Sequence, residues 1–302
     1  YGTTPDRLTK VFSKANSLGL NIFCGTGVDG EHDPSSEEPN IRKNALQYLK
    51  NCIDIAAQGN ACAINGVLYA PWQAFSDIPK EKRWENSAQV LREAAEYGAE
   101  KGIDLHVEVI NRFESDFMNT LEEGAAFLEK VNHAHVKLLV DTFHMNIEED
   151  NMFTSIKKYI SKIGCIHICE NHRGVPGTGH IDWKQLIETL EEVGYDGFLE
   201  METFTEKGTE VARGMGIWRQ IGKETPLEEA KKGINDMVEC YKGIKERATD
   251  DTISDILLGI VFTNCKRRNN DKIIYEKCCE TYPDSPFREM LIPESKNVVE
   301  CE

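Results

Sequence analysis

The sequence predicts an α/β fold of the (β/α)₈ barrel type, on two observations. First, short apolar runs alternate with amphipathic segments along most of the chain, which is typical of parallel strands joined by return helices. Second, residues of metal-ligand type lie at or near the ends of four predicted strands, at spacings of 33, 26 and 35 residues: Glu108, Asp141, His167 and Glu202. A strand, its helix and two loops take up roughly 30 residues, so these side chains should converge at the carboxyl ends of successive strands.

The strands are expected, in chain order, at Leu20–Cys24, Ala61–Tyr69, Leu105–Ile110, Val136–Val140, Cys165–Cys169 and Phe198–Met201. Most are apolar enough to be buried on both faces, as in a parallel sheet. Helical periodicity predicts helices at residues 5–18, 40–58, 84–101, 119–131, 152–162, 182–193 and 226–247. These strands are two fewer than the eight of a closed barrel. The expected strands therefore leave such a barrel two strands short of closure.

The chain is expected to form a barrel domain over residues 1–249, followed by a C-terminal tail over residues 250–302. The tail breaks the strand–helix alternation and shows no obvious amphipathic helix. One interpretation is a separate or docked segment of unknown role. The other is that the strand-like runs Ile256–Thr263 and Glu289–Ile292, which flank a possible helix at 271–280, supply the two missing strands. If nothing fills the gap, open sheet edges make a stable monomer unfavourable.

Composition excludes several classes of partner. The chain has 35 basic and 51 acidic residues and a net charge of −16, which repels nucleic acid and anionic membrane surfaces and leaves small neutral or cationic ligands. No apolar run of membrane-spanning length occurs, and the N-terminus lacks the order of a secretory signal. Ten cysteines without a CxxC pair indicate free thiols in a reducing compartment. A soluble, cytoplasmic protein is expected.

The four ligand-type residues suit a divalent cation. Three carboxylates and one imidazole favour Mn²⁺, Co²⁺ or Mg²⁺ over structural zinc, which more often binds thiolates. Glu108 interrupts an apolar strand, and a buried carboxylate needs a compensating cation; the alternative is an ion pair with Arg112. Asp141 could instead cap the following helix while His144 is exposed. In the segment Cys165–Cys169, alternate residues stand about 7 Å apart on a strand, so only His167 is a credible ligand.

Further side chains near the same strand ends could contact a substrate. Arg173 follows the fifth strand and could donate two hydrogen bonds to substrate oxygens, with a surface arginine as the alternative. Glu200 and Glu202 share a face of their strand, and Glu202 is nearer the carboxyl end. The aromatic residues Trp72, Trp84 and Phe204 could wall a sugar-sized pocket, although such residues often pack a barrel core.

Four sequence strings together resemble the ketose 3-epimerase family, which includes D-tagatose and D-psicose (allulose) 3-epimerases. They are Asn40-Ile-Arg-Lys-Asn-Ala45, Glu108-Val-Ile-Asn-Arg-Phe-Glu114, Asp141-Thr-Phe-His-Met-Asn-Ile-Glu-Glu-Asp150 and Arg173-x-Val-Pro-Gly-x-Gly179. The resemblance covers residues from about Pro5 to Lys245. It implies a xylose-isomerase-like (β/α)₈ barrel that binds Mn²⁺ or Co²⁺ and epimerises free ketoses at C3.

Position by position, the resemblance implies the same metal ligands as the spacing: Glu108, Asp141, His167 and Glu202. It implies substrate contacts at Glu114, His144 and Arg173. Glu108 and Glu202 would be the catalytic acid and base, one removing the C3 proton and the other returning a proton to the opposite face of a cis-enediolate. His144 and Arg173 would stabilise charge on oxygen. Family members are commonly dimers or tetramers, so a homo-oligomer is expected.

The chain departs from the family pattern in three places. Tyr1 falls near the family's second helix, so the resemblance implies a barrel that lacks its first two strands. Thr203 stands where many members have Pro, and Cys169 stands where Gly is usual. The tail has no recognised counterpart. These departures leave substrate preference open, and they keep two alternatives in view: a sugar isomerase or dehydratase on the same barrel, and a non-catalytic remnant that binds metal or sugar.

Overall fold

The computed structural model describes residues 5–245 and 257–260. The chain divides into two units, of which the larger, Ile22–Thr263, holds the sheet. The other unit consists of residues 1–21 and 264–302, and its described part includes the helix α1 (Pro5–Ser17), which was expected at 5–18. Among the described residues, no helix has the length and hydrophobicity that a membrane span requires.

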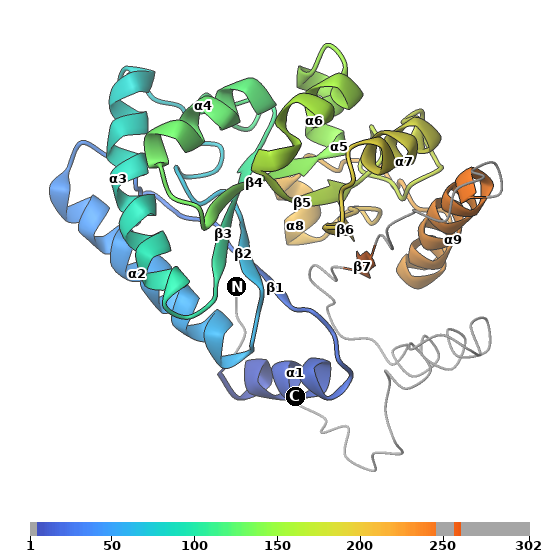
Figure 1. Cartoon of the computed structure of the whole chain (residues 1–302), viewed down its shortest axis with the longest axis horizontal. Coiled ribbons are helices and arrows are strands. Elements are labelled where there is room, and N and C mark those ends of the chain that lie inside the picture. The colour runs from blue at the N-terminus through green and yellow to red at the C-terminus, as the bar shows by residue number, and fades with distance from the viewer. Residues whose placement is uncertain (1–4, 246–256, 261–302) are drawn as a thin grey trace. The chain divides into compact units, whose positions relative to one another are not determined.

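A curled sheet of seven parallel strands organises the larger unit (Figure 1). Its strands are β1 (Phe23–Gly25), β2 (Ala63–Gly66), β3 (Asp104–Val109), β4 (Val136–Asp141), β5 (Ile163–Ile168), β6 (Phe198–Met201) and β7 (Leu257–Ile260). Neighbours in the sheet are neighbours in the chain. Because every pairing is parallel, all carboxyl ends lie along one edge, as a (β/α) barrel requires.

Helices on the outer side of the sheet return the chain between strands (Figure 1). They are α2 (Pro39–Gln58), α3 (Lys80–Ala99), α4 (Leu121–Val131), α6 (Met152–Tyr159), α7 (Trp183–Glu192) and α9 (Pro226–Lys245), with a 3₁₀ turn η1 (Ile160–Lys162) after α6. Two shorter helices, α5 (Thr142–Glu148) and α8 (Glu210–Gly214), follow β4 and β6. The caps explain local boundaries: for example, α4 begins after Thr120, whose hydroxyl accepts the N–H of Glu123, and ends at a left-handed Asn132.

The main core lies between the sheet and these helices. The β4 residues Leu138, Leu139 and Val140 are fully buried, which explains why the strand is a continuous apolar run rather than an alternating one. Phe117 and Phe127 belong to a cluster of aromatic rings between α3, α4 and β3. Their ring centroids lie 5.1 Å apart in an edge-on arrangement. Such pairs add to the stability that burial supplies.

Comparison with the expected elements shows where local patterns were insufficient. Helix α3 begins at Lys80, four residues before the expected start, because its first turn is polar and follows Pro79. Strand β2 is shorter than Ala61–Tyr69 because Gly66, at φ +137°, turns the chain. Helices α5 and α8 were not expected, since five to seven residues are too few for periodicity to register.

The expected α/β barrel-type fold is confirmed, and the sheet has one described strand more than the six expected. The added strand is β7, which lies within the strand-like run Ile256–Thr263 and pairs with β6, Phe198 opposite Leu257. The second run, Glu289–Ile292, and the possible helix at 271–280 lie outside the described residues. The division of the chain at residue 249 stays a prediction.

A glycine at the end of β2 provides a test of this packing. A Cβ on Gly66 would overlap the carbonyl oxygen of Thr26, whereas a Cβ on Gly102, which also has positive φ, would meet nothing within 4 Å. We expect Gly102→Ala to cost about 1–2 kcal/mol of strain. Gly66→Ala should cost about 1–3 kcal/mol more because the β1 and β2 loops must separate. Chemical denaturation of the two variants measures the difference; equal stabilities would contradict the close approach.

Candidate active site

The four predicted ligand residues lie together at the carboxyl edge of the sheet. Glu108 comes from β3, Asp141 ends β4, His167 lies on β5 and Glu202 follows β6. Each offers one ligand atom, and these atoms all lie within 4.8 Å of one another. The register contributes directly, since the Cα of Asp141 is paired with that of His167. We call these four residues the ligand cluster.

The ligand cluster concentrates negative charge in a poorly hydrated place. The side chain of Asp141 is fully buried, and those of Glu108 and Glu202 are 12% and 17% exposed. Burial, reinforced by the charge of Glu202, raises the pKa of Glu108 to about 8. Burial also raises the pKa of Asp141 to about 6, although Arg173 opposes this. Without a cation, the cluster therefore cannot easily hold all its carboxylates ionised.

His167 has the properties of a metal ligand. Both of its ring nitrogens are buried and have no hydrogen-bond partner; Nδ1 lies 3.5 Å from Glu202 and Nε2 lies 3.5 Å from Glu200. Burial would lower the pKa of His167, but Glu202, Glu200 and Glu108 raise it well above its usual value. Unpartnered imidazole nitrogens beside three carboxylates fit a divalent cation of the Mn²⁺, Co²⁺ or Mg²⁺ type.

Neighbouring contacts test the two structural alternatives, an ion pair between Glu108 and Arg112 and a helix cap by Asp141. Arg112 does not pair with Glu108; its guanidinium lies 3.0 Å from the carboxylate of Glu148. Asp141 does cap a helix, because its Oδ1 accepts the N–H of Phe143 at 2.9 Å at the start of α5. The cap does not exclude the site, since the other oxygen of Asp141 remains within the ligand cluster and His144 is buried rather than exposed.

Arg173 is buried beside the ligand cluster rather than exposed at the surface. Its backbone is left-handed, with φ +67°. Its Nη1 donates to Asp141 Oδ2 at 2.8 Å, and its guanidinium carbon lies 3.8 Å from the ring centre of Phe143 and 5.3 Å from that of Phe204. A second arm, Nη2, lies 3.7 Å from Glu114 Oε1. The planar group is therefore held by two aromatic rings and by two carboxylates.

His144 is held by a residue that sequence patterns did not single out. Its Nδ1 accepts the backbone N–H of Asn111 at 3.1 Å and lies 2.8 Å from the side-chain amide nitrogen of the same residue. Nε2 of His144 lies 3.2 Å from Nη2 of Arg173, a group that can only donate, so both ring nitrogens face hydrogen-bond donors. Burial and the nearby Arg173 lower the pKa of His144 well below its usual value, which keeps it neutral. Nε2 also lies 3.7 Å from Glu108 Oε1, so the imidazole adjoins the ligand cluster.

Glu114 is tied to the same group of residues. It accepts a hydrogen bond from Asn111 Nδ2 at 2.9 Å and another from the indole N–H of Trp72 at 2.8 Å. Phe204 lies beside Arg173 and packs with Ala212 and Ile217 in a small apolar cluster. The structure thus brings Glu114, His144, Arg173 and Phe204 to the ligand cluster, together with Trp72. Their roles toward a substrate stay predictions.

Trp84 is not brought to the site. It lies on α3, where its indole N–H donates to the carbonyl of Phe117 at 2.9 Å and its ring packs against Phe117 and Phe127. The expectation that Trp84 walls a sugar pocket is therefore corrected in favour of core packing. The physical reason is that its indole packs with the rings of Phe117 and Phe127, which leaves the residue 8% exposed.

A second group of ligand-type atoms lies next to the first. Cys165, His167 and Glu200 offer atoms within 4.8 Å of one another, and all three are buried. Glu200 on β6 thus brings Cys165 into a group with His167, and the expectation that only His167 of its segment is a ligand stays a prediction. Asn65 and His106 complete this buried polar patch. A polar residue interrupting each apolar strand was the signal available in the sequence.

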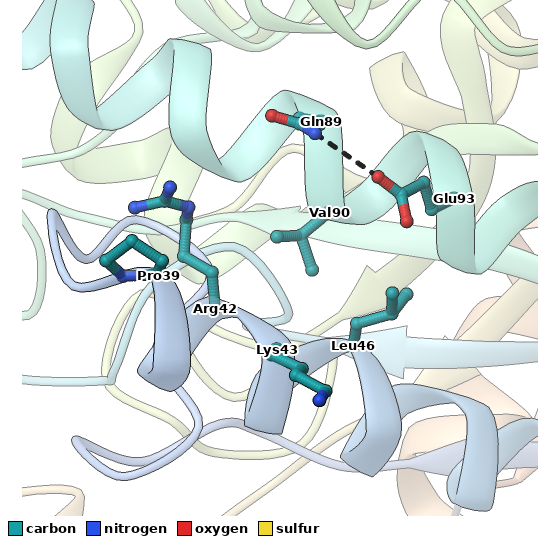
Figure 2. A pocket seen from close by; sticks show the side chains of 7 residues that line it. All are labelled: Pro39, Arg42, Lys43, Leu46, Gln89, Val90 and Glu93. Carbon is teal, nitrogen blue, oxygen red and sulfur yellow. Dashed lines mark hydrogen bonds between the residues drawn. The ribbon is translucent and has the colours of Figure 1, made fainter.

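The structure also has a hollow between α2 and α3, away from the strand ends (Figure 2). It is lined by Pro39, Arg42, Lys43, Leu46, Gln89, Val90 and Glu93. Figure 2 shows Gln89 hydrogen-bonded to Glu93 one turn along α3, at 3.3 Å. Because these residues lie on the outer helices, the hollow takes no part in the ligand cluster.

The fold and the site define a class of barrel that known proteins share. Residues 2–235 match the family model described as xylose isomerase-like TIM barrel. The chain belongs to this family. The similarity to ketose 3-epimerases predicted from the sequence strings is also confirmed.

Characterised relatives include several sugar epimerases. A D-psicose 3-epimerase of Ruminiclostridium cellulolyticum is 35% identical over 76% of this chain and 81% of its own length. An L-ribulose 3-epimerase of Mesorhizobium japonicum is 32% identical over 68% of this chain and 69% of its own length. A crystal structure of the D-psicose 3-epimerase of Clostridium cellulolyticum H10 with D-tagatose has a TM-score of 0.72 and 32% identity, covering 81% of this chain and 84% of that one. These relatives are carbohydrate epimerases, the enzyme class that the sequence predicted.

The raised pKa of Glu108 predicts the pH dependence of the metal-free protein. A carboxyl group whose folded pKa is raised from 4.5 to about 8 contributes stability below about pH 4.5 that is lost as the pH rises to about 8. We expect the free energy of unfolding in excess chelator to fall across this window, by at most about 1.4 kcal/mol per pH unit from this group. Glu108→Gln should flatten the slope, and Glu122→Gln, at an exposed position, should not. A wild-type slope in Glu108→Gln would contradict the assignment.

Proposed function

We propose that the protein catalyses metal-dependent epimerisation of free ketoses at C3, with substrates of the D-tagatose, D-fructose or D-psicose type. The observation that carries the proposal is the ligand cluster, in which glutamates from β3 and β6 lie within 4.8 Å of a common set of ligand atoms. The named activities of the relatives support the same chemistry.

The cation would be Mn²⁺ or Co²⁺, with Mg²⁺ as an alternative, held by Glu108, Asp141, His167 and Glu202. When bound, it would polarise the carbonyl next to C3 and so make the C3 proton more acidic. The chain's own residues would perform the remaining steps.

Two glutamates can serve as the proton-transfer pair. Glu108 and Glu202 come from β3 and β6, which are separated in the sheet by β4 and β5, so their carboxylates approach the centre of the cluster from different strands. Inversion at carbon requires a base on one face and an acid on the other. One glutamate would remove the C3 proton, and the other would return a proton to the opposite face of the planar enediolate.

The neighbouring donors can hold the sugar oxygens. The imidazole of His144 and the guanidinium of Arg173 both adjoin the cluster, and each is fixed by its own partners, Asn111 and Asp141. Fixed donors stabilise charge that develops on oxygen without having to reorganise. Glu114 can accept a hydroxyl hydrogen. The concentration of carboxylates favours a neutral sugar over a sugar phosphate.

The reaction can be followed by proton NMR in D₂O with D-fructose or D-tagatose and Mn²⁺. Wild-type protein should lose the C3 proton signal while the C3 epimer appears. Glu202→Gln should reduce this exchange at least about 100-fold because a general acid–base group is removed. Glu206→Gln, an exposed glutamate of the same loop, should behave as wild type.

Other products of the same experiment decide between the alternatives. An aldose would indicate a sugar isomerase, and a dehydrated ketone would indicate a dehydratase. Folded, metal-bound protein that exchanges no proton with either sugar would favour the non-catalytic remnant. Normal turnover by Glu202→Gln would contradict the assigned proton-transfer pair.

The metal requirement has a separate test. Chelation should abolish exchange, and Mn²⁺ or Co²⁺ should restore it. At free Mn²⁺ of 100 times its Kd, the free energy of unfolding should rise by about 2.7 kcal/mol. Asp141→Asn should lose this stabilisation, while Asp150→Asn, at an exposed position, should keep it. Calorimetry with and without Mn²⁺ measures both, and equal stabilisation of the Asp141 variant would exclude it as a ligand.

Two further expectations from the sequence remain proposals. The resemblance to ketose 3-epimerases implies a homo-oligomer, either a dimer or a tetramer. The cysteine usage and charge imply a cytoplasmic location.

A further inference from the structure

Glu200 is a buried acid that the proposed reaction does not use. It lies on β6, two residues before Glu202, and its side chain is 2% exposed. Successive same-face residues of a strand lie at different depths, so Glu200 is one step farther from the carboxyl edge than Glu202. A carboxylate in such a place is costly unless its oxygens are matched by donors. The hydrogen-bond donors around Glu200 indicate its role.

Two strands supply partners that hold Glu200 in one orientation. The Asn65 amide nitrogen of β2 lies 3.2 Å from each carboxylate oxygen. The Cys165 thiol of β5 donates to Oε1 at 2.8 Å. Oδ1 of Asn65 lies 3.0 Å from Nδ1 of His106, which fixes the amide with its nitrogen toward Glu200. These contacts leave Oε2 facing Nε2 of His167, 3.5 Å away.

The imidazole of His167 thus stands between two carboxylates, with Glu202 at Nδ1 and Glu200 at Nε2. A proton on Nε2 directed at Glu200 leaves the Nδ1 lone pair free on the side of the ligand cluster. Metal-binding histidines generally donate their other N–H to an oxygen acceptor, which fixes the tautomer and raises the basicity of the ligating nitrogen. Glu200, which lies on β6 two residues before Glu202, is placed to be such an acceptor.

We propose that Glu200 is a positioning residue that holds His167 in the Nε2–H tautomer and so increases the affinity of the ligand cluster for its divalent cation. The inference rests on the proposed metal-dependent function. Asn65 acts through Glu200, by holding the carboxylate in place.

The neighbouring thiol suggests a different arrangement, in which Cys165, His167 and Glu200 themselves bind a cation. The geometry disfavours it. Sγ and Oε1 are 2.8 Å apart, as in a hydrogen bond, whereas two ligands on a tetrahedral zinc ion would be separated by about 3.5 Å, given the usual metal–ligand distances. The amide of Asn65 also occupies both carboxylate oxygens.

Isothermal titration of the metal-free protein with Mn²⁺ tests the proposal. Glu200→Gln should weaken Mn²⁺ binding about 10- to 100-fold. The matched control is Glu229→Gln, which removes a buried carboxylate that binds the backbone N–H groups of Lys223 and Glu224 and should leave the Mn²⁺ Kd unchanged. Should Glu200→Gln fold poorly by circular dichroism, Asn65→Ala replaces it and should also weaken binding. In the Mg²⁺-bound protein, two-bond ¹H–¹⁵N NMR of histidine should show Nε2–H at His167 in wild type, and this proton should exchange faster with solvent in Glu200→Gln.

The outcomes separate this inference from the proposed function. If wild type binds no Mn²⁺, the proposed function fails, and the inference fails with it. If wild type binds Mn²⁺ and Glu200→Gln binds it equally well with an unchanged Nε2–H signal, only the positioning role is overturned. If Glu229→Gln loses binding as severely as Glu200→Gln, the loss follows from removing any buried carboxylate and the positioning role is again overturned.

Discussion

The structure depends on one constraint, which is the burial of several carboxylates at the place where parallel strands end. Three acids of the ligand cluster lie within 4.8 Å of one another and of His167, and burial raises the pKa of Glu108 and of Asp141. Isolated buried charges of one sign are expensive. A divalent cation at this point would neutralise the carboxylates of the ligand cluster. The surrounding residues hold each acid in place.

Arg173 is a buried cation at the centre of the site. It bonds to Asp141 and approaches Glu114 and Glu202, and its guanidinium packs against the rings of Phe143 and Phe204. One guanidinium cannot balance all these acids. It lies beside His144 and Glu114, which share the partner Asn111. The ligand cluster and these neighbours are thus parts of one hydrogen-bonded network.

Packing outside the site maintains this arrangement. The hydroxyl of Tyr69, a fully buried residue, donates to the backbone carbonyl of Glu108 at 2.9 Å, and its ring stacks on Phe117 at 4.6 Å. Trp84 packs against the same Phe117. The aromatic cluster therefore supports the strand end that carries one ligand, which explains how Trp84 can matter to the site without contacting a substrate.

The sequence by itself determined the fold class, the order of the strands and the four residues of the ligand cluster. These properties follow from periodicity and spacing: apolar runs of strand length recur with return helices, and parallel strands place their carboxyl ends at one edge. Even the weak strand signal at Ile256–Thr263 corresponded to a described strand, Leu257–Ile260.

Only the tertiary structure decided which polar residues share partners. Asn65, His106, Cys165 and Glu200 lie far apart in the sequence, and their contacts depend on strand register and side-chain direction. Short helices such as α5 were not predicted from local patterns. The buried position of Arg173 was not predicted either, because its left-handed backbone and its packing against aromatic rings depend on contacts with distant segments. Trp84 shows the converse, since an aromatic residue has the same local signature whether it packs a core or lines a pocket.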